Sequence, residues 1–525
     1  MQKYLLGISA VNLYAVFSQS DNISMFRGAS LTLREAARLP DAVFNDARVT
    51  SEPVSIGASE GVYLITGEET NLSALLVKVK EHLAANYLGY TFVTDTVPLN
   101  GDYNTAKTHL KNRLGRLQQK QTRVSLQFSD TTTVCELTHM LPGETTEPVQ
   151  GEKRTVSAIA ATRFKKGRDE KQTFYENELQ TLGIPFERKL TFTNDLIALS
   201  ENKEYRRLDG KVAYIYLDGN KFTAIQKESV DSVKTQQDFD NAMQTLRGQL
   251  LDELLSWCAN DPDWQTSKGK IRLETLLWGG DEILFVIPAW KALDTTAKIF
   301  DITRNWQFNG YPLTHAVGVL LCKNSMPVFR MRQVAQKLAD EQKVHAKSRF
   351  KGQADETHNT VAIAGTINVF DMLVLESEDF AEDSIGAHAN HRYGKLAEIR
   401  NQAMPGAFSE QQLADIRAKL VLMSRSQIYL LANTATICTN FGESDSRFVQ
   451  QEERFVLVQD GVTKEAYDDL TKLLGLLLLG LNAEELYPIT ADKEALALSE
   501  QKRGLTWLLV TECSEYLLPE KEERA

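Results

Sequence analysis

Two stretches of the sequence decide the fold: residues 211–220, KVAYIYLDGN, and residues 273–287, LETLLWGGDEILFVI. The first holds a nearly continuous apolar run, which is typical of a strand covered on both faces. The second holds two apolar runs around Gly279-Gly280-Asp281-Glu282, and glycine pairs between apolar runs are a strong hairpin signal. If the first strand neighbours the hairpin in one sheet, the carboxylates of Asp218, Asp281 and Glu282 converge beside glycines.

Such a group of carboxylates has a clear chemical use. Carboxylates on adjacent strands supply the hard oxygen ligands that bind Mg²⁺ or Mn²⁺ and leave room for waters and substrate phosphates. Glycines without a Cβ let a nucleotide approach the backbone closely. Two ions about 4 Å apart would clamp the attacking hydroxyl and the triphosphate of a phosphoryl transfer. Each motif alone is more often an ordinary turn, so the prediction rests on their combination with a third element.

The third element is the end of a predicted helix over Val328–Lys347, where the sequence reads ADEQKVHAKSRFKG at residues 339–352. Lys343, Lys347 and Lys351 recur every four residues and share one face if the helix persists. A lysine stripe is most often a solvated surface. A lysine at the end of a helix that follows a buried strand can instead reach phosphates as a mobile point charge.

Composition excludes several classes of protein. The 525 residues are 42% hydrophobic and 25% charged, a globular balance that argues against wholesale disorder and a fibrous repeat. The net charge of −11 argues against non-specific coating of nucleic acid, which needs clustered positive charge. The five cysteines form no CxxC pair, so neither a zinc framework nor a disulfide framework is indicated. Without a signal-peptide pattern or an apolar run near the ~20 residues that span a bilayer, we expect a cytoplasmic protein.

The remaining pattern divides the chain into four parts. Residues 1–130 alternate strands and helices and predict a small α/β or ferredoxin-like sheet. The predicted strands are Tyr4–Val11, Gly61–Thr66, Tyr90–Val97 and Arg123–Phe128, and the predicted helices are Ala29–Phe44, with Ser30 as its cap and Pro40 near its end, and Asn71–Ala85. Residues 131–205 are a linker with helices. Residues 206–378 resume alternating elements, and residues 379–525 predict a helical bundle.

Several polar or aromatic residues could have a functional role, but a structural role is favoured for each of them. A basic cluster in the linker is interpreted as a solvated loop rather than an RNA contact; it consists of Arg163, Lys165, Lys166 and Arg168. His388 and His391 are spaced like metal ligands, but a surface loop is favoured for them. Trp278, directly before the glycines, could stack on a base, and core packing is slightly favoured.

These motifs carry a resemblance to a known family. DGNKF at 218–222, GGDE at 279–282 and AVGVLLCKNSMPVFRMRQVAQKLADEQKVHAK at 316–347 resemble the GGDEF/palm nucleotidyl cyclase superfamily. The closer resemblance is to the large polymerase subunit of type III CRISPR effector complexes. Residues 3–36, KYLLGISAVNLYAVFSQSDNISMFRGASLTLREA, are similar to that family's first palm domain. The resemblance implies an α+β chain with two ferredoxin-like palm domains, at 1–130 and 206–378, and a helical C-terminal domain at 379–525.

The sequence departs from the family pattern in three places. The family's GGDD is GGDE here, which keeps a carboxylate with a longer reach. The segment CELTHMLPGE at 135–144, where the family often binds zinc, retains only Cys135 with His139 nearby, so that metal site is expected to be lost. No His-Asp dipeptide occurs, and no domain precedes the first palm. The resemblance therefore implies a version without the HD nuclease, and DNA cleavage by this chain is not expected.

The family's site residues carry over onto matching positions of this chain. Asp218, helped by the Gly219 carbonyl, and Asp281 are expected to bind the metal ions, and Glu282 to assist metal binding or deprotonation of a 3′-hydroxyl. Nucleotide-binding positions implied in the same way are Gly219, Asn220, Gly279, Gly280, Lys347 and, more weakly, Lys351. The implied cofactor is Mg²⁺ or Mn²⁺, and the implied substrate is ATP.

The implied activity is synthesis of a cyclic oligonucleotide, an oligoadenylate second messenger, in antiviral defence. The implied partners are subunits of a guide-RNA complex and target RNA, with no membrane. One alternative is a stand-alone defence nucleotide synthase that works without guide RNA. Another is a non-catalytic palm scaffold or nucleotide sensor, against which the intact carboxylates speak.

Overall fold

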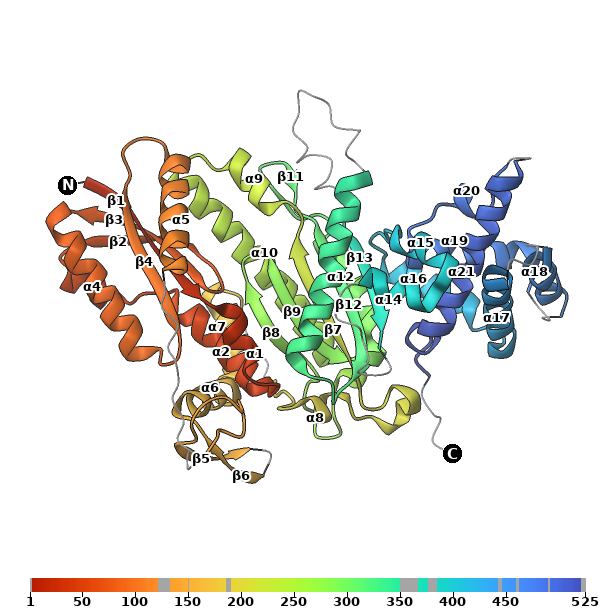
Figure 1. The fold of residues 1–525 in the computed structure, drawn as a ribbon, viewed down its shortest axis with the longest axis horizontal. Coiled ribbons are helices and arrows are strands. Elements are labelled where there is room, and N and C mark those ends of the chain that lie inside the picture. The colour runs from red at the N-terminus through yellow and green to blue at the C-terminus, as the bar shows by residue number, and fades with distance from the viewer. Residues whose placement is uncertain are drawn as a thin grey trace.

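A computed structural model describes residues 2–120, 133–149, 151–185, 190–349, 367–375, 385–441, 446–458, 462–489 and 492–520. The predicted strand Arg123–Phe128 and the predicted site residue Lys351 lie outside the described residues. The architecture is mixed α/β: the described residues form a four-stranded sheet, a five-stranded sheet and two small two-stranded sheets, with helices at the C-terminal end (Figure 1).

The first domain has the βαββαβ order of a ferredoxin-like fold. Its elements are β1 (Gln2–Val11), α1 (Leu13–Ser18), α2 (Ile23–Ala36), α3 (Asp41–Asp46), β2 (Thr50–Ile56), β3 (Glu60–Gly67), α4 (Glu69–Asn86), β4 (Thr91–Pro98) and α5 (Tyr103–Gln119). The sheet order is β2-β3-β1-β4, and all neighbouring strands are antiparallel. Two split βαβ units around a central hairpin produce this order, which confirms the ferredoxin-like prediction.

The second domain repeats the same topology and adds one strand. Its elements are β7 (Lys211–Gly219), α9 (Phe222–Ser229), α10 (Val233–Asn260), β8 (Glu274–Gly279), β9 (Glu282–Pro288), α11 (Ala292–Thr303), β10 (Gln307–Phe308), β11 (Tyr311–Pro312), β12 (His315–Lys323), α12 (Val328–Arg349) and β13 (Val369–Val374). The sheet order is β13-β12-β7-β9-β8. Strand β13 is parallel to β12, so α12 is the crossover that joins them.

Strand β7 shows how the sheet is buried on both faces. Its alternate residues Ala213, Ile215 and Leu217 belong to the apolar core that includes helices α10 and α11. Tyr214 and Tyr216 belong to a second core that includes α12 and the first domain's α2. Because side chains alternate along a strand, Asp218 continues the Tyr214–Tyr216 series and lies on the α12 side of the sheet.

The helix predicted over Ala29–Phe44 is wrong in both bounds. Helix α2 begins at Ile23, where the Asn22 side chain accepts hydrogen bonds from the backbone N–H groups of Ser24 and Met25. Asparagine caps a helix as well as serine does, so Ser30 falls inside the helix rather than before it. Helix α2 ends at Ala36, and Pro40 stands immediately before the separate helix α3.

The linker contains a hairpin and helices: β5 (Thr145–Val149), β6 (Glu152–Val156), α6 (Ala158–Asp169), α7 (Lys171–Thr181), α8 (Leu196–Ser200) and a 3₁₀ turn at Lys203–Leu208. The basic cluster predicted as a solvated loop is therefore on helix α6. Arg163 is buried, donates to the Gln19 side chain at 2.7 Å, and stacks over the Tyr90 ring at 4.5 Å. Lys166 is paired with Glu170 at 2.8 Å. The loop interpretation was wrong because the cluster lies on a helix, and two of its members, Arg163 and Lys166, contact the first domain, Lys166 through an ion pair with Glu35.

The C-terminal region is helical throughout its described residues. Its helices are α14 (Ile385–Tyr393), α15 (Ala397–Asn401), α16 (Glu410–Leu420), α17 (Arg425–Phe441), α18 (Ser446–Val458), α19 (Lys464–Leu479), α20 (Ala483–Leu486) and α21 (Lys493–Leu517). In Figure 1 these helices lie on the far side of the second domain from the first. His388 and His391 are on helix α14, so the surface-loop prediction for them was wrong. Among the described helices, none combines the length and apolar character needed to cross a bilayer.

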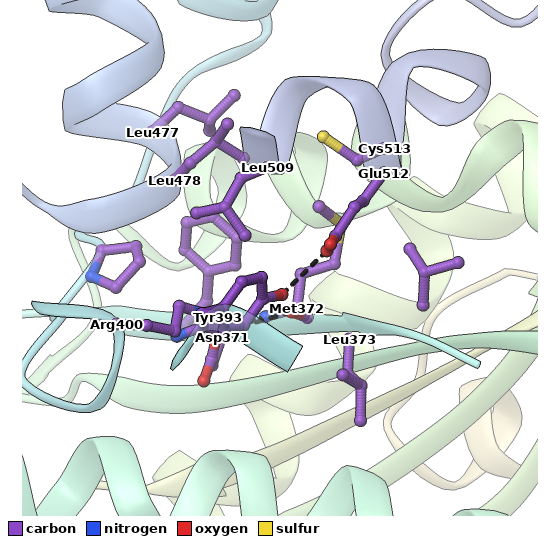
Figure 2. A pocket seen from close by; sticks show the side chains of 13 residues that line it. Asp371, Met372, Leu373, Tyr393, Arg400, Leu477, Leu478, Leu509, Glu512 and Cys513 are labelled. Carbon is purple, nitrogen blue, oxygen red and sulfur yellow. Dashed lines mark hydrogen bonds and ion pairs between the residues drawn. The ribbon is translucent and has the colours of Figure 1, made fainter. Parts of the chain in front are cut away.

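Figure 2 shows the junction between the edge strand β13 and these helices. A small cavity of about 30 Å³ lies there, lined by residues of β13 and of α14, α15, α19 and α21. Arg400 is ion-paired with Asp371 at 2.5 Å, and the Tyr393 hydroxyl donates to Glu512 at 2.8 Å. Buried polar groups are therefore paired where the helical region meets the sheet.

Candidate active site

The two strands that carry the acidic motifs are neighbours in the sheet. Strands β7 and β9 pair in antiparallel register, with Asp218 directly opposite Glu282. The Gly219 N–H donates to the Asp281 carbonyl at 3.2 Å, which fastens the turn to the end of β7. Side chains directly opposite on antiparallel strands have Cβ atoms roughly 5 Å apart, and like charges there are destabilising. The register therefore places two carboxylates where a nearby cation is needed to offset their repulsion.

The carboxylates perturb one another. Burial, followed by the charge of Asp218, raises the pKa of Asp281 above its usual value. Burial, followed by the charges of Asp218 and Asp281, likewise raises the pKa of Glu282. Burial, followed by the charges of Glu282 and Asp218, raises the pKa of Tyr216, which lies on the same face of the sheet as Asp218. A bound cation would oppose these shifts, because it favours the ionised carboxylates.

In the described structure the nearest cation is Lys343 of helix α12. Its ammonium group forms an ion pair with the Asp218 carboxylate, and the two side chains are 17% and 12% exposed. Its charge also opposes the raised pKa of Asp281. Lys347 lies one turn further along α12, and its side chain is outside what the structure describes. Of the lysine stripe seen in the sequence, Lys343 is thus the member that the described structure brings to the carboxylates.

Two arginines that sequence reasoning missed also approach the site. The Arg332 guanidinium lies over the Phe17 and Phe26 rings at 5.6 and 5.9 Å, and its charge opposes the raised pKa of Glu282. Arg247 donates to the Gly280 carbonyl, and burial lowers its pKa to about 10. The available signal was an arginine within an apolar helical pattern, because a buried guanidinium requires a partner.

The glycines of the motifs have different surroundings. A Cβ on Gly279 would lie 2.5 Å from the Cβ of Ala58 in the first domain's β2–β3 turn, and a Cβ on Gly219 would lie 2.7 Å from the Phe222 ring. Gly280 has a φ of +58°, and no described atom lies within 4 Å of where its Cβ would be. Close packing therefore accounts for Gly219 and Gly279, whereas Gly280 leaves open space beside the carboxylates.

Asn220 and His315 flank the end of β7 and are both buried. The Asn220 amide nitrogen donates to the Thr314 hydroxyl and to the Ile367 carbonyl, each at 3.2 Å. His315 lies opposite Gly219 on strand β12, and burial together with the Lys343 charge lowers its pKa to about 4. Asn220 thus ties β7 to the segment before β13, and His315 is a neutral neighbour of the site.

A metal site can be tested against these side chains. Within the described ranges, no group of three or more His, Cys, Asp and Glu side chains lies close enough together to hold a metal ion. Mg²⁺, however, is often held by one or two carboxylates with waters and substrate phosphates. Asp218 and Asp281 provide such a pair, because the hydrogen bond from the Gly219 N–H to the Asp281 carbonyl brings the two residues to the same strand end. The oxygen donors fit Mg²⁺ or Mn²⁺, with Lys343 paired to one of them.

The first domain has the same positions with different residues. Strand β1 pairs with β3 so that Ser9 is opposite Glu60, as Asp218 is opposite Glu282 in the second domain. The turn before Glu60 reads Gly57-Ala58-Ser59-Glu60, where the second domain reads Gly279-Gly280-Asp281-Glu282. The Ser9 hydroxyl donates to Glu60 at 2.8 Å. Among the residues that the structure describes, only the second domain therefore places several carboxylates at this end of its sheet.

Two ferredoxin-like domains in tandem, an acidic strand end in the second and a helical C-terminal region define the class: a tandem palm-domain protein. No family model matches the chain, and no curated protein matches it. Solved structures do match in fold. Csm1 from T. onnurineus is 11% identical with a TM-score of 0.49, and the match covers 99% of this chain and 70% of that one.

Two further matches are structures of a Csm1–Csm4 cassette. The one in complex with cA4 is 11% identical with a TM-score of 0.43, covering 97% of this chain and 70% of that one. The one in complex with AMPPNP is 11% identical with a TM-score of 0.42, with the same coverage. Csm1 is a type III CRISPR large subunit, the family that the sequence motifs resemble.

Proposed function

We propose that this chain is a metal-dependent nucleotidyltransferase that makes a cyclic oligonucleotide, an oligoadenylate, from ATP in antiviral defence. The observation that carries the proposal is the register that sets Asp218 opposite Glu282 beside the turn holding Asp281. A like-charge pair at a largely buried position costs stability, and such positions are typical of sites that bind a cation. The substrate, the product and the setting come from the family resemblance.

Each residue has a defined task in this proposal. Asp218 and Asp281 would hold Mg²⁺ or Mn²⁺, which when bound neutralises the charge of the triphosphate and the attacking oxygen. Glu282 assists in metal binding or accepts the proton of the attacking 3′-hydroxyl. The open space beside Gly280 is where the backbone allows a nucleotide to approach.

The phosphate contacts fall to helix α12. Lys343 is already at the carboxylates, and Lys347 follows on the next turn of the helix. Lys351 remains a weaker prediction beyond the helix. Lysine suits this task because its ammonium is a mobile charge on a flexible stem. The other predicted nucleotide-binding residues are Gly219, Asn220 and Gly279. They would act by shaping the backbone at the end of β7 and at the β8–β9 turn.

The partners follow from the same resemblance. We propose that the chain works with the subunits of a guide-RNA complex and with target RNA. The solved cassettes that it matches in fold contain Csm4 beside Csm1. Copurification from the native host separates this assignment from a stand-alone synthase, because a complex subunit brings guide RNA and small protein partners with it.

The deciding experiment is incubation of the purified complex and its target RNA with ATP and Mg²⁺ or Mn²⁺, followed by mass spectrometry of the products. The matched control is Asp281→Asn, which preserves the shape of the side chain and removes its charge. A cyclic oligoadenylate from the wild type and none from the variant supports the proposal. Equal products from both, or none from either, contradicts it, and tight ATP binding without turnover favours a nucleotide sensor.

A further inference from the structure

The ion pair between Lys343 and Asp218 occupies a carboxylate that the proposed function assigns to a metal ion. Asp218 is the carboxylate expected to bind a metal ion, yet in the described structure an ammonium group holds one of its oxygens. An ammonium and a divalent cation are attracted to the same lone pairs, so the two compete for Asp218. The inference that follows rests on the proposed function, because it concerns the same metal and nucleotide.

Helix α12 cannot withdraw Lys343 by moving as a body. Gly318 of strand β12 lies so close to the Ala335 carbonyl that a Cβ on the glycine would overlap it. Leu338 and Ala339 are fully buried, and the Gln342 side chain donates to the Ala403 carbonyl at 3.2 Å. The helix is therefore fixed on both sides of the site. Only the four-carbon stem of Lys343 is free to take its ammonium group elsewhere.

The charges around the site explain why Lys343 is needed when no metal is bound. Asp218 and Glu282 face each other across two strands, and Asp281 lies beside them. Lys343 cancels one of the negative charges and keeps the strand ends together. A divalent ion would supply the same neutralisation, after which the ammonium would lack a partner.

We infer that Lys343 is an internal counter-ion that a divalent cation must displace from Asp218, and that a nucleotide triphosphate helps by giving the ammonium group a new partner. Metal alone therefore binds weakly, and nucleotide and metal strengthen each other's binding. By reciprocity, the factor by which nucleotide tightens metal binding equals the factor by which metal tightens nucleotide binding. The site thus stays metal-free until its substrate arrives.

The test measures Mn²⁺ binding directly, by electron paramagnetic resonance of free Mn²⁺ and by calorimetry, with and without AMPPNP. The variant is Lys343→Met, which keeps the length of the stem and removes the charge. Lys343→Arg keeps the charge and tests whether any cation suffices. The matched control is Lys337→Met, an exposed lysine on another face of the same helix. All four proteins are compared for folding by circular dichroism.

For the wild type we expect AMPPNP to tighten Mn²⁺ binding by about tenfold or more. For Lys343→Met we expect Mn²⁺ alone to bind about fivefold or more tightly than to the wild type, with most of the nucleotide effect lost. Lys337→Met should behave as the wild type. Unchanged or weaker Mn²⁺ binding by a folded Lys343→Met overturns the inference, and so does an undiminished nucleotide effect.

The failure of this inference differs from a failure of the proposed function. If Mn²⁺ binds the wild type and Asp218→Asn abolishes that binding, the metal site stands whatever Lys343 does. If Mn²⁺ binds none of these proteins, with or without nucleotide, the metal-dependent function itself is contradicted, and the inference falls with it.

Discussion

A buried ionic cluster joins the three N-terminal parts of the chain, and its perturbation gives a quantitative prediction. Glu274, at the start of β8, accepts from Arg27 Nε at 2.6 Å and from Lys171 Nζ at 2.6 Å, and all three side chains are almost fully buried. Arg27 is on helix α2, and Lys171 begins helix α7 and also donates to the Thr193 carbonyl. One carboxylate thus holds two cations.

The pKa values show that the two cations are not equivalent. Burial by itself raises the pKa of Glu274, but the charges of Arg27 and Lys171 outweigh it and lower the pKa below its usual value. Burial lowers the pKa of Lys171 from 10.5 to about 8, despite the attraction of Glu274. At about 1.4 kcal/mol per factor of ten in proton affinity, this lowering of the pKa means that the fold disfavours charged Lys171 by about 3 kcal/mol.

Opposite results are therefore expected from two substitutions. Glu274→Gln leaves two buried cations without their counter-ion, which costs about 3–5 kcal/mol of unfolding free energy. Lys171→Met removes the group that the fold disfavours and leaves the Arg27–Glu274 pair intact, so its effect is neutral or stabilising. As a control, Asp95→Asn breaks a pair with the half-exposed Arg113 and should cost less than about 1 kcal/mol.

The lowered pKa of Lys171 also makes the stability of the protein depend on pH. Between pH 8 and 10.5 the unfolded chain holds a proton on Lys171 that the folded chain has released, so wild-type stability rises with pH in this window. Denaturant unfolding of the wild type and of Lys171→Met from pH 7 to 10.5 measures this rise, up to about 3 kcal/mol, as the difference between the two. Parallel curves, or a Glu274→Gln variant as stable as the wild type, would refute the reasoning.

Three further predictions concern the site. Gly279→Ala puts a Cβ against Ala58, which should lower the free energy of unfolding by about 1–3 kcal/mol and reduce product formation. Adding Ala58→Gly should restore part of the stability and part of the activity. Equal thermal unfolding of Gly279→Ala and the wild type would contradict this. Because the pKa of His315 is about 4 against 6.5 unfolded, its contribution to stability is lost as pH falls from 6.5 to 4, by up to about 3 kcal/mol, and unfolding of His315→Gln should lack this loss. Arg247→Gln removes the donor to the Gly280 carbonyl and should lower the turnover of ATP by at least about tenfold, while an unchanged rate would show that the turn holds its shape unaided.

Strands with a continuous apolar run could be predicted from the sequence, because burial on both faces leaves a direct pattern. Strands β7 and β9 are examples, and their pairing brought Asp218 and Glu282 together as the motifs indicated. Strand β2, TSEPVSI, is mostly exposed and contains a proline at the edge of its sheet. Its partner β3 and the contacts of α10 stabilise it, and neither leaves a signal in its own sequence.

The sequence could not predict which lysine contacts the carboxylates of the site. Lys343, Lys347 and Lys351 are equivalent in the sequence pattern, and the two later ones were favoured by the family resemblance. Which lysine reaches Asp218 depends on where α12 crosses the sheet. That position is set by the close approach of Gly318 to the Ala335 carbonyl, a contact between residues whose sequence spacing gives no hint of it. The domain boundaries predicted at 130, 205 and 378 remain predictions.

The two palm domains differ in the residue that lies opposite the glutamate at the end of the central strand. This difference favours the second domain as the place of the proposed active site. In the first domain, Ser9 takes the place opposite the glutamate, so Glu60 accepts a hydrogen bond instead of facing a second charge. Gln118 in turn donates to the Ser9 hydroxyl at 2.9 Å. That arrangement is stable without any ligand. In the second domain, Asp218 faces Glu282, and Lys343 is ion-paired with Asp218. Like charges directly opposite each other on antiparallel strands are destabilising, so a cation stabilises this strand end. Under the proposed function a metal ion would take the place of Lys343. The first domain's remaining contribution is mechanical, because its Ala58 packs against Gly279 and supports the turn that carries Asp281.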